Sequence, residues 1–476
     1  MKQIIVTISL AVMFCMNISA QHKREIRAVW LTVNHNLDWP DTPAVSKQGI
    51  EKQKTALDNM LDRLKEANIN MVFFQVRIRG SVTYSSAIEP FSELIKSRRC
   101  TEDFDALGYA IEGCHRRGME LHAWFVVYPL GKNPGNNSLR SISVKFKNEW
   151  YINPGNPGTT PYLVNLVREL VEKYDIDGIH FDYIRYPDGS AKFPDDREFK
   201  LYGNGKTKDQ WRRGNINRFV YEAYDAVKAL KPWVIVSSAV VGMYNTLAEV
   251  NRKHWTAYNS VFQDPVDWIT KGKHDFIVPM LYSKDNLFFP FIDDWVERCG
   301  RERVVPGLGI YMISDASWSP DIITGQVRYL RDNKLPGCAF FRVRNLTDDA
   351  GFYKLVTSGY FPDPALLPAV EVSRQAPCTP GSFRVWGSGG SMNLSWDRFS
   401  DADDIFYNVY CSESFPVDTD NPKNLIVARL DDTECKLNVS HCNHGLYYCT
   451  VTAYDRYHNE SMISETALFV VGEYEK

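Results

Sequence analysis

Short apolar runs alternate with amphipathic segments along most of the chain. The runs have the length and the β-branched character of buried strands. They are Ile26–Val33, Asn70–Ile78, Glu120–Val127, Gly178–Ile184, Val234–Val241, Phe276–Tyr282, Val304–Ile310 and Cys338–Val343. The segments between them carry apolar residues at helical spacing, for example Leu57, Leu61 and Leu64. Strands that alternate with helices in this way predict an α/β fold, a (β/α)₈ TIM barrel.

The pattern changes near Phe361, where a proline-rich stretch indicates a linker. Beyond it, short strands follow one another without helices. They are Ser382–Trp386, Met392–Trp396, Tyr407–Ser412, Leu425–Arg429, Glu434–Val439, Tyr447–Tyr454 and Ala467–Val471. This spacing is typical of an all-β, immunoglobulin-like sandwich. We therefore expect a barrel over residues 24–362 and a β-sandwich over residues 376–474.

The first twenty residues have the pattern of an export signal. Lys2 supplies the positive start, Ile4 to Met16 the apolar stretch, and Ile18-Ser19-Ala20 a cleavage site. The apolar stretch is too short for a stable membrane anchor. We expect a signal peptide at residues 1–20 and an exported protein of the periplasm, cell envelope or extracellular space, with no transmembrane anchor.

The composition limits the classes of binding partner that we expect. The chain is 44% hydrophobic and 24% charged, as soluble globular proteins are. A net charge of -3 without any basic run argues against a nucleic-acid partner. The cysteines match no zinc spacing, but the four from Cys411 to Cys449 could pair within the last domain. We expect a monomer without metal or cofactor.

The strand at Gly178–Ile184 carries the clearest candidate chemistry. Alternation puts His180 and Asp182 on one face, and Tyr183 follows directly. Active sites of TIM barrels lie at the carboxyl ends of the strands, so we expect the Asp182 carboxylate to point into a cleft there. An aspartate that only caps the following loop is the alternative.

Other polar residues fall at the same ends of neighbouring strands or open the helix after the fourth strand. Buried charges need partners, so several polar residues at the same end of the barrel indicate a polar cleft. For each residue taken alone, ion pairing, helix capping or loop anchoring is the alternative explanation. The expected substrate contacts are Asp38, Arg77, His122, Trp124, Tyr128, His180, Arg185, Tyr186, Trp211, Arg212, Arg213, Tyr282 and Arg342.

Tryptophans and tyrosines in the loops suit a groove for sugars, because a pyranose ring has an apolar face. Hydrolysis of a glycosidic bond uses two carboxyl groups, a nucleophile or base and an acid with a raised pKa. Asp182 is the first candidate. Asp264, in the long segment after the fifth strand, is the preferred second one, and Asp38 is the alternative.

At these residues the chain resembles the glycosyl-hydrolase-like family ten, bacterial envelope proteins with a TIM barrel. The resemblance runs from Arg24 to Tyr360. It rests on Arg27–Thr32 with Asp38–Pro40, Phe74–Arg77, His122–Phe125, Asp177–Tyr183 with Tyr186 and Pro187, Trp211–Arg213 with Asn215 and Asn217, and Gln263 and Asp264 with Trp268. It implies glycosidase activity, with peptide-free peptidoglycan glycan strands as the substrate of a bacterial member, and the family's aspartate corresponds to Asp182.

Two blocks depart from the family pattern. Gly80-Ser81 stands where members usually have Gly-Asp, and Val126-Val127-Tyr128 where they usually have Asn-Pro-Tyr. The last ~95 residues resemble a fibronectin type III module, a class of spacers or weak binders.

Two rival functions stay open at this point. Because of Ser81, one is a non-catalytic glycan-binding barrel. The other is a metal-dependent hydrolase, because His122, His180 and Asp182 have the residue types of a two-histidine, one-carboxylate site.

Overall fold

The computed structural model describes residues 21–248, 250, 255–370, 375–388, 390–398, 404–440 and 442–472. The predicted signal peptide at residues 1–20 lies outside them. In the described part of the chain, no helix has the length and apolar character needed to cross a membrane.

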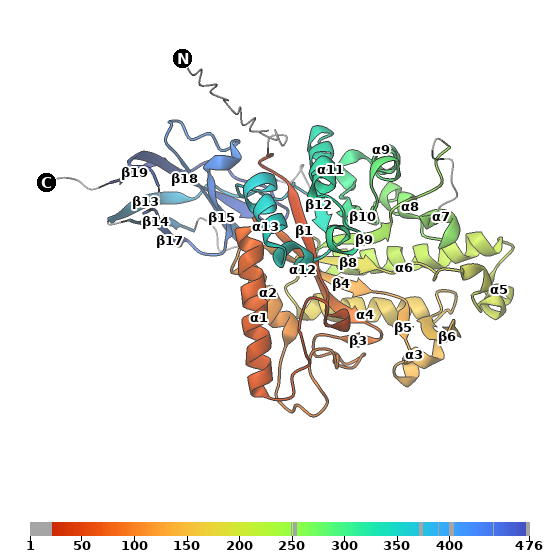
Figure 1. Ribbon diagram of the computed structural model, residues 1–476. Helices are drawn as coiled ribbons and strands as arrows, with labels where there is room; N and C mark the ends of the chain where they lie inside the picture. Colours follow the sequence, from red (N-terminus) through yellow and green to blue (C-terminus); the bar gives the residue numbers. More distant parts are fainter. Residues whose placement is uncertain are drawn as a thin grey trace, which may run out of the picture.

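Parallel strands close into a barrel (Figure 1). They are β1 (Ile26–Leu31), β2 (Met71–Ile78), β4 (Glu120–Val126), β8 (Gly178–Asp182), β9 (Ile235–Val241), β10 (Phe276–Met280), β11 (Gly307–Leu308) and β12 (Gly337–Phe340). The order is β1-β12-β11-β10-β9-β8-β4-β2, and β1 also pairs with β2, so the sheet has no open edge. Each strand overlaps a run expected from the sequence, and the predicted TIM barrel is confirmed.

Amphipathic helices cover the outside of the barrel. The longer ones are α1 (Lys47–Glu66), α2 (Ala106–His115), α4 (Thr159–Lys173), α6 (Lys208–Leu230), α9 (Phe289–Cys299) and α11 (Pro320–Asp332). The shorter ones are α3 (Asn137–Ser141), α5 (Asp196–Tyr202), α7 (Ala257–Ser260), α8 (Pro265–Thr270), α10 (Met312–Asp315), α12 (Val343–Thr347) and α13 (Ala350–Leu355). In α1 the helical spacing buries Leu57, Leu61 and Leu64, and the Ser46 side chain caps the first turn by accepting from the Gly49 N–H.

The segment after β4 contains a small antiparallel sheet. Its strands are β5 (Pro129–Gly131), β6 (Ser143–Phe146) and β7 (Glu149–Ile152), in the order β5-β7-β6. Another short strand, β3 (Ser81–Val82), pairs antiparallel with β2. Both additions lie at the carboxyl ends of the barrel strands, and residues of β5 and β7 form part of the wall of a cleft there.

The C-terminal region is an all-β sandwich, as predicted. One sheet contains β13 (Gly381–Ser388), β14 (Ser391–Asp397) and β17 (Glu434–Asn438). The other contains β16 (Leu425–Leu430), β15 (Ile405–Ser412), β18 (Gly445–Asp455) and β19 (Ala467–Val471). A disulfide joins Cys411 and Cys449 on adjacent strands, whereas Cys435 and Cys442 are free thiols.

Buried ion pairs join the two domains below β4 and β8. Arg429 of β16 forms an ion pair with Asp177, immediately before β8. His458, after β18, lies 2.6 Å from Glu120 at the start of β4. Burial alone would raise the pKa of Asp177, but Arg429 and His115 beside it lower the pKa to about 2. Side chains of the sandwich therefore pair with carboxylates that are buried in the barrel.

Arg429→Ala is expected to destabilise the protein by about 3–5 kcal/mol, because it leaves the buried Asp177 carboxylate without its main partner. Arg98→Ala is the matched control: Arg98 also pairs with a carboxylate, Glu93 at 2.6 Å, but its side chain is 82% exposed. Chemical denaturation of both variants measures the difference. Equal midpoints for the two would contradict this role of the domain interface.

Candidate active site

A cleft of about 420 Å³ opens at the carboxyl ends of the barrel strands. Its floor and walls come from β2, β4, β8 and β10, from the residues after β1 and β12, and from the small β5-β7-β6 sheet. The lining residues are Thr32, Asn34, Leu37, Gln75, Ile78, Arg79, Trp124, Val126, Pro129, Gly131, Glu149, Tyr151, Asp182, Tyr183, Arg185, Met280, Tyr282 and Phe341. Of the residues expected from the sequence, the cleft brings together Asp182, Trp124, Arg185 and Tyr282.

Asp182 is buried at the end of β8 and is held by donors on two sides. The indole Nε1–H of Trp124 donates to Oδ2 at 3.1 Å, and the backbone N–H of Tyr183 donates to Oδ1 at 2.6 Å. The guanidinium of Arg185 lies 3.6 Å from Oδ1. Burial raises the pKa of Asp182, and Arg185 and the two N–H donors offset this only in part. The pKa of this carboxyl group therefore lies above that of an ordinary aspartate.

His180 lies below Asp182 in the interior of the barrel and does not line the cleft. Its ring stacks on Phe73 with 4.0 Å between centroids. Burial, with smaller contributions from His122 and His274, lowers the pKa of His180 well below its ordinary value, so the ring is neutral. Its Nε2 then accepts from the Trp30 indole at 3.1 Å, and its Nδ1–H donates to the Ser237 hydroxyl at 2.9 Å.

The three residues of the metal-site hypothesis do not converge on one point. His122 Nε2 lies 3.0 Å from Glu120, towards the opposite end of β4, and both ring nitrogens of His180 are engaged. Across the described residues, no group of three or more His, Cys, Asp and Glu side chains has the arrangement of a metal site. Thus the structure offers no support for a His122, His180 and Asp182 centre.

Glu149 is a second carboxyl group in the cleft, and sequence reasoning missed it. It lies in β7 of the small sheet and is exposed. Tyr151, two residues further on the same strand face, donates its hydroxyl proton to Glu149 at 3.2 Å. Burial raises the pKa of Tyr151 to about 12, with Glu149 adding to the shift. The alternation of Glu149 with Tyr151 is the signal that could have revealed this strand.

Asp264, the expected second carboxyl group, lies outside the cleft lining. It is the N-cap residue of α8, where its side chain accepts from the Asp267 N–H at 3.4 Å. It also accepts from the Tyr244 hydroxyl at 2.9 Å. Asp264 followed by Pro265 at the first helical position is a helix-start pattern, which accounts for the residue without any catalytic role.

Several other expected contacts are held in ion pairs and do not line the cleft. Asp38 pairs with Arg342 at 2.6 Å beneath the β1 loop. The Arg77 guanidinium forms two hydrogen bonds with Glu89 and further ones with the carbonyls of Val126 and Val127. These pairs hold the strand ends and loops in place, so they support the cleft without lining it.

Trp211, Arg212 and Arg213, at the start of α6, also contact other protein groups and do not line the cleft. Arg212 is 1% exposed and its guanidinium pairs with Asp195 at 2.6 Å. Trp211 packs against Phe199, and Arg213 lies 4.0 Å from the ring of Tyr258. The two remaining expected contacts, Tyr128 and Tyr186, are also buried outside the cleft lining.

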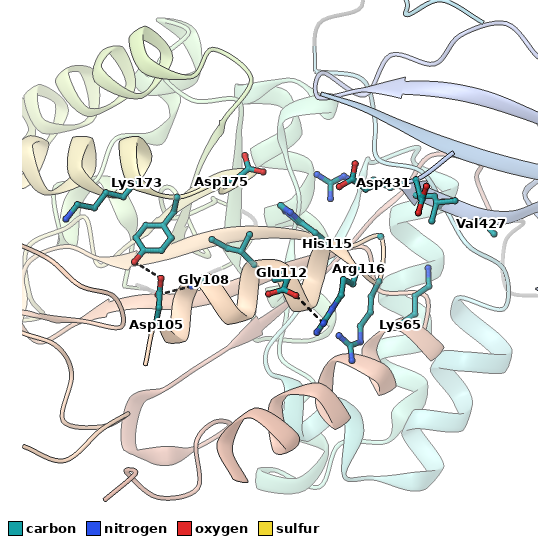
Figure 2. Close-up of a pocket in the computed structure, with 18 residues that line it drawn as sticks. Lys65, Asp105, Gly108, Glu112, His115, Arg116, Lys173, Asp175, Val427 and Asp431 are labelled. Atoms are coloured by element: carbon teal, nitrogen blue, oxygen red, sulfur yellow. Dashed lines mark hydrogen bonds and ion pairs between the residues drawn. The ribbon is translucent and has the colours of Figure 1, made fainter. Parts of the chain in front are cut away.

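A larger hollow of about 910 Å³ lies between α2 and β16, where the two domains meet (Figure 2). Its charged groups are largely paired. Arg116 lies 3.2 Å from Glu112, Arg117 forms an ion pair outside the hollow, and Tyr174 donates to Asp105 at 3.0 Å. Because these pairs need no ligand, we place the candidate active site in the smaller cleft around Asp182.

Comparison with known proteins shows the family of this chain. Residues 25–294 match the glycosyl hydrolase-like 10 family. The chain belongs to this family. It is 27% identical to glycosyl hydrolase YngK of Bacillus subtilis, over 97% of this chain and 96% of YngK. It is 26% identical to glycosyl hydrolase DigH of Escherichia coli K12, over 65% of this chain and 79% of DigH.

Among solved structures, the glycoside hydrolase domain of PgaB from Bordetella bronchiseptica has a TM-score of 0.47 with this family member. The alignment is 14% identical and covers 71% of this chain and 99% of that domain.

Asp182→Asn is expected to lose less stability than the wild type as the pH rises. The folded-state pKa of Asp182 is raised, so the wild type loses stability as the pH rises through that value. The amide does not titrate, and its one oxygen accepts from either the Trp124 or the Tyr183 N–H, a change in stability that does not depend on pH. Thermal unfolding at pH ~3, where the carboxyl is protonated even when unfolded, and at pH 7 should show the Tm of the variant rising relative to that of the wild type. A Tm difference that is the same at both pH values would contradict the raised pKa.

Proposed function

We propose that this protein is an exported glycoside hydrolase in which Asp182 acts as the general acid. The single observation that carries the proposal is a buried carboxyl group with a raised pKa at the floor of a cleft, at the carboxyl end of a TIM-barrel strand. Sequence reasoning expected Asp182 as nucleophile or base. Burial supports the opposite role, because an acid must carry its proton at the working pH.

Glu149 is the partner that we propose for Asp182. It lines the same cleft from the small sheet and is exposed, so its carboxyl group can contact a sugar or a water molecule. It would act as nucleophile or base while Asp182 protonates the leaving oxygen. Tyr151, hydrogen-bonded to Glu149, holds its orientation.

The proposed substrate is a bacterial envelope polysaccharide, in the first place the glycan strands of peptidoglycan without stem peptides. The family resemblance and the export pattern at residues 1–20 support this choice. Trp124, Tyr183 and Tyr282 supply aromatic surface in the cleft against which sugar rings can pack.

A non-catalytic glycan-binding barrel is the second candidate function, and Ser81 is the observation that favours it. This serine stands where family members usually have aspartate. It lies in β3 outside the cleft lining, and its hydroxyl donates to the Ile78 carbonyl at 2.9 Å. If the missing aspartate is essential, the wild type should bind glycan strands and release no product.

Asp182→Asn and Glu149→Gln are each expected to lower kcat by about 10²–10⁴-fold, the usual contribution of a positioned acid or base. The assay incubates protein with purified glycan strands, with and without stem peptides, and follows products by mass analysis. Asp264→Asn is the matched control: asparagine preserves the helix cap, so its rate should stay near that of the wild type. Undiminished turnover by Asp182→Asn refutes the catalytic assignment.

The rate should also fall as the pH rises through the pKa of Asp182, because the general acid is active only when protonated. A profile of kcat/KM against pH measures this alkaline limb. The limb should be absent from the residual activity of Asp182→Asn. A limb that persists unchanged in the variant would assign the acid to another group.

A further inference from the structure

A second hollow continues the cleft beyond Arg185. It has a volume of about 280 Å³, and three residues line both hollows, namely Arg185, Met280 and Tyr282. Trp255, which is 43% exposed, stands on its wall. A glycan that occupies both hollows would therefore pass directly over Arg185, with one of its sugars against the Trp255 ring.

The guanidinium of Arg185 is buried but incompletely satisfied. It lies 4.3 Å from the centre of the Tyr183 ring and 5.5 Å from that of Trp255. Within the described structure its Nη1 has no hydrogen-bond partner, since the Asp182 carboxyl oxygen, 3.6 Å away, is too distant for a hydrogen bond. A buried N–H without an acceptor costs free energy, so this geometry favours a ligand that supplies one.

The charges of the cleft indicate which kind of ligand group would accept a hydrogen bond from Arg185. With Asp182 protonated as the general acid, Arg79 and Arg185 face a single remaining carboxylate, Glu149. Arg79 is exposed and contacts His35 at 2.7 Å. An arginine fork matches a carboxylate better than it matches a neutral hydroxyl, because both N–H groups can donate to one charged partner.

We propose that Arg185 binds a carboxylate carried by the glycan, at the junction of the two hollows, and so selects acidic glycans. This inference rests on the proposed glycan-cleaving function and names the chemical class of its substrate. The carboxylate has two possible sources, the ring carboxylate of a uronic acid and the lactyl carboxylate of a peptide-free peptidoglycan strand. The rings of Tyr183 and Trp255 both lie close to the guanidinium.

Binding to the Asp182→Asn variant tests the inference without turnover. The probes are oligosaccharides from peptide-free peptidoglycan strands and from a polyuronate, each in native form and after reduction of its carboxyl groups to alcohols. Calorimetry should show one native form binding about 10–100-fold more tightly than its reduced counterpart, as expected for a charge-assisted hydrogen bond. The oligosaccharide whose native form binds more tightly than its reduced form identifies the carboxylate that Arg185 binds.

Arg185→Gln in the same background should abolish that difference, and Arg185→Lys, which keeps the charge without the fork, should keep part of it. Arg63→Gln is the matched control, because Arg63 also stacks 4.3 Å from a tyrosine ring, that of Tyr353, but lies on α1 outside both hollows. Thermal unfolding verifies that each variant is folded.

Equal affinity for native and reduced forms of both sources would overturn the inference, as would a preference that survives Arg185→Gln. Failure of the hydrolase proposal has a different signature. In that case the wild type releases no product from any probe. The affinities measured on Asp182→Asn still show whether Arg185 binds a carboxylate.

Discussion

The carboxyl group of Asp182 is removed from water, and the rest of the site follows from that constraint. A buried carboxylate is costly unless donors surround it, and the barrel supplies them from adjacent strands. The register of β4 against β8 sets Trp124 beside His180 and Val126 beside Asp182, so the indole of Trp124 can reach the carboxyl oxygen. These donors are too few to cancel the cost of burial, and the pKa of Asp182 stays above its ordinary value.

The same two strands are secured at their other ends by the β-sandwich. Glu120 begins β4 and Asp177 precedes β8, and His458 and Arg429 of the sandwich approach these two carboxylates. The C-terminal domain is thus part of the electrostatic balance of the barrel. The strands that carry Trp124 and Asp182 are therefore held both by the sandwich and by the hydrogen bond between these two side chains.

The sequence predicted the barrel, the sandwich and the place of Asp182 at the end of a barrel strand, because alternation and helical spacing are local properties. Pairing partners far along the chain are not local. Arg77 and Arg212 were expected in the cleft. Instead, Arg77 forms an ion pair with Glu89, and Arg212 forms one with Asp195. Glu149 was missed because β7 is stabilised by its neighbours β5 and β6 and not by a long apolar run.

The pKa of Asp182 itself is the most direct test of this account. Titration of the side-chain carboxyl carbons by NMR, with Asp182→Asn to assign the resonance, would measure it. The account predicts a midpoint above the ordinary aspartate value of about 3.9. A midpoint at or below that value would contradict the assignment of Asp182 as the general acid.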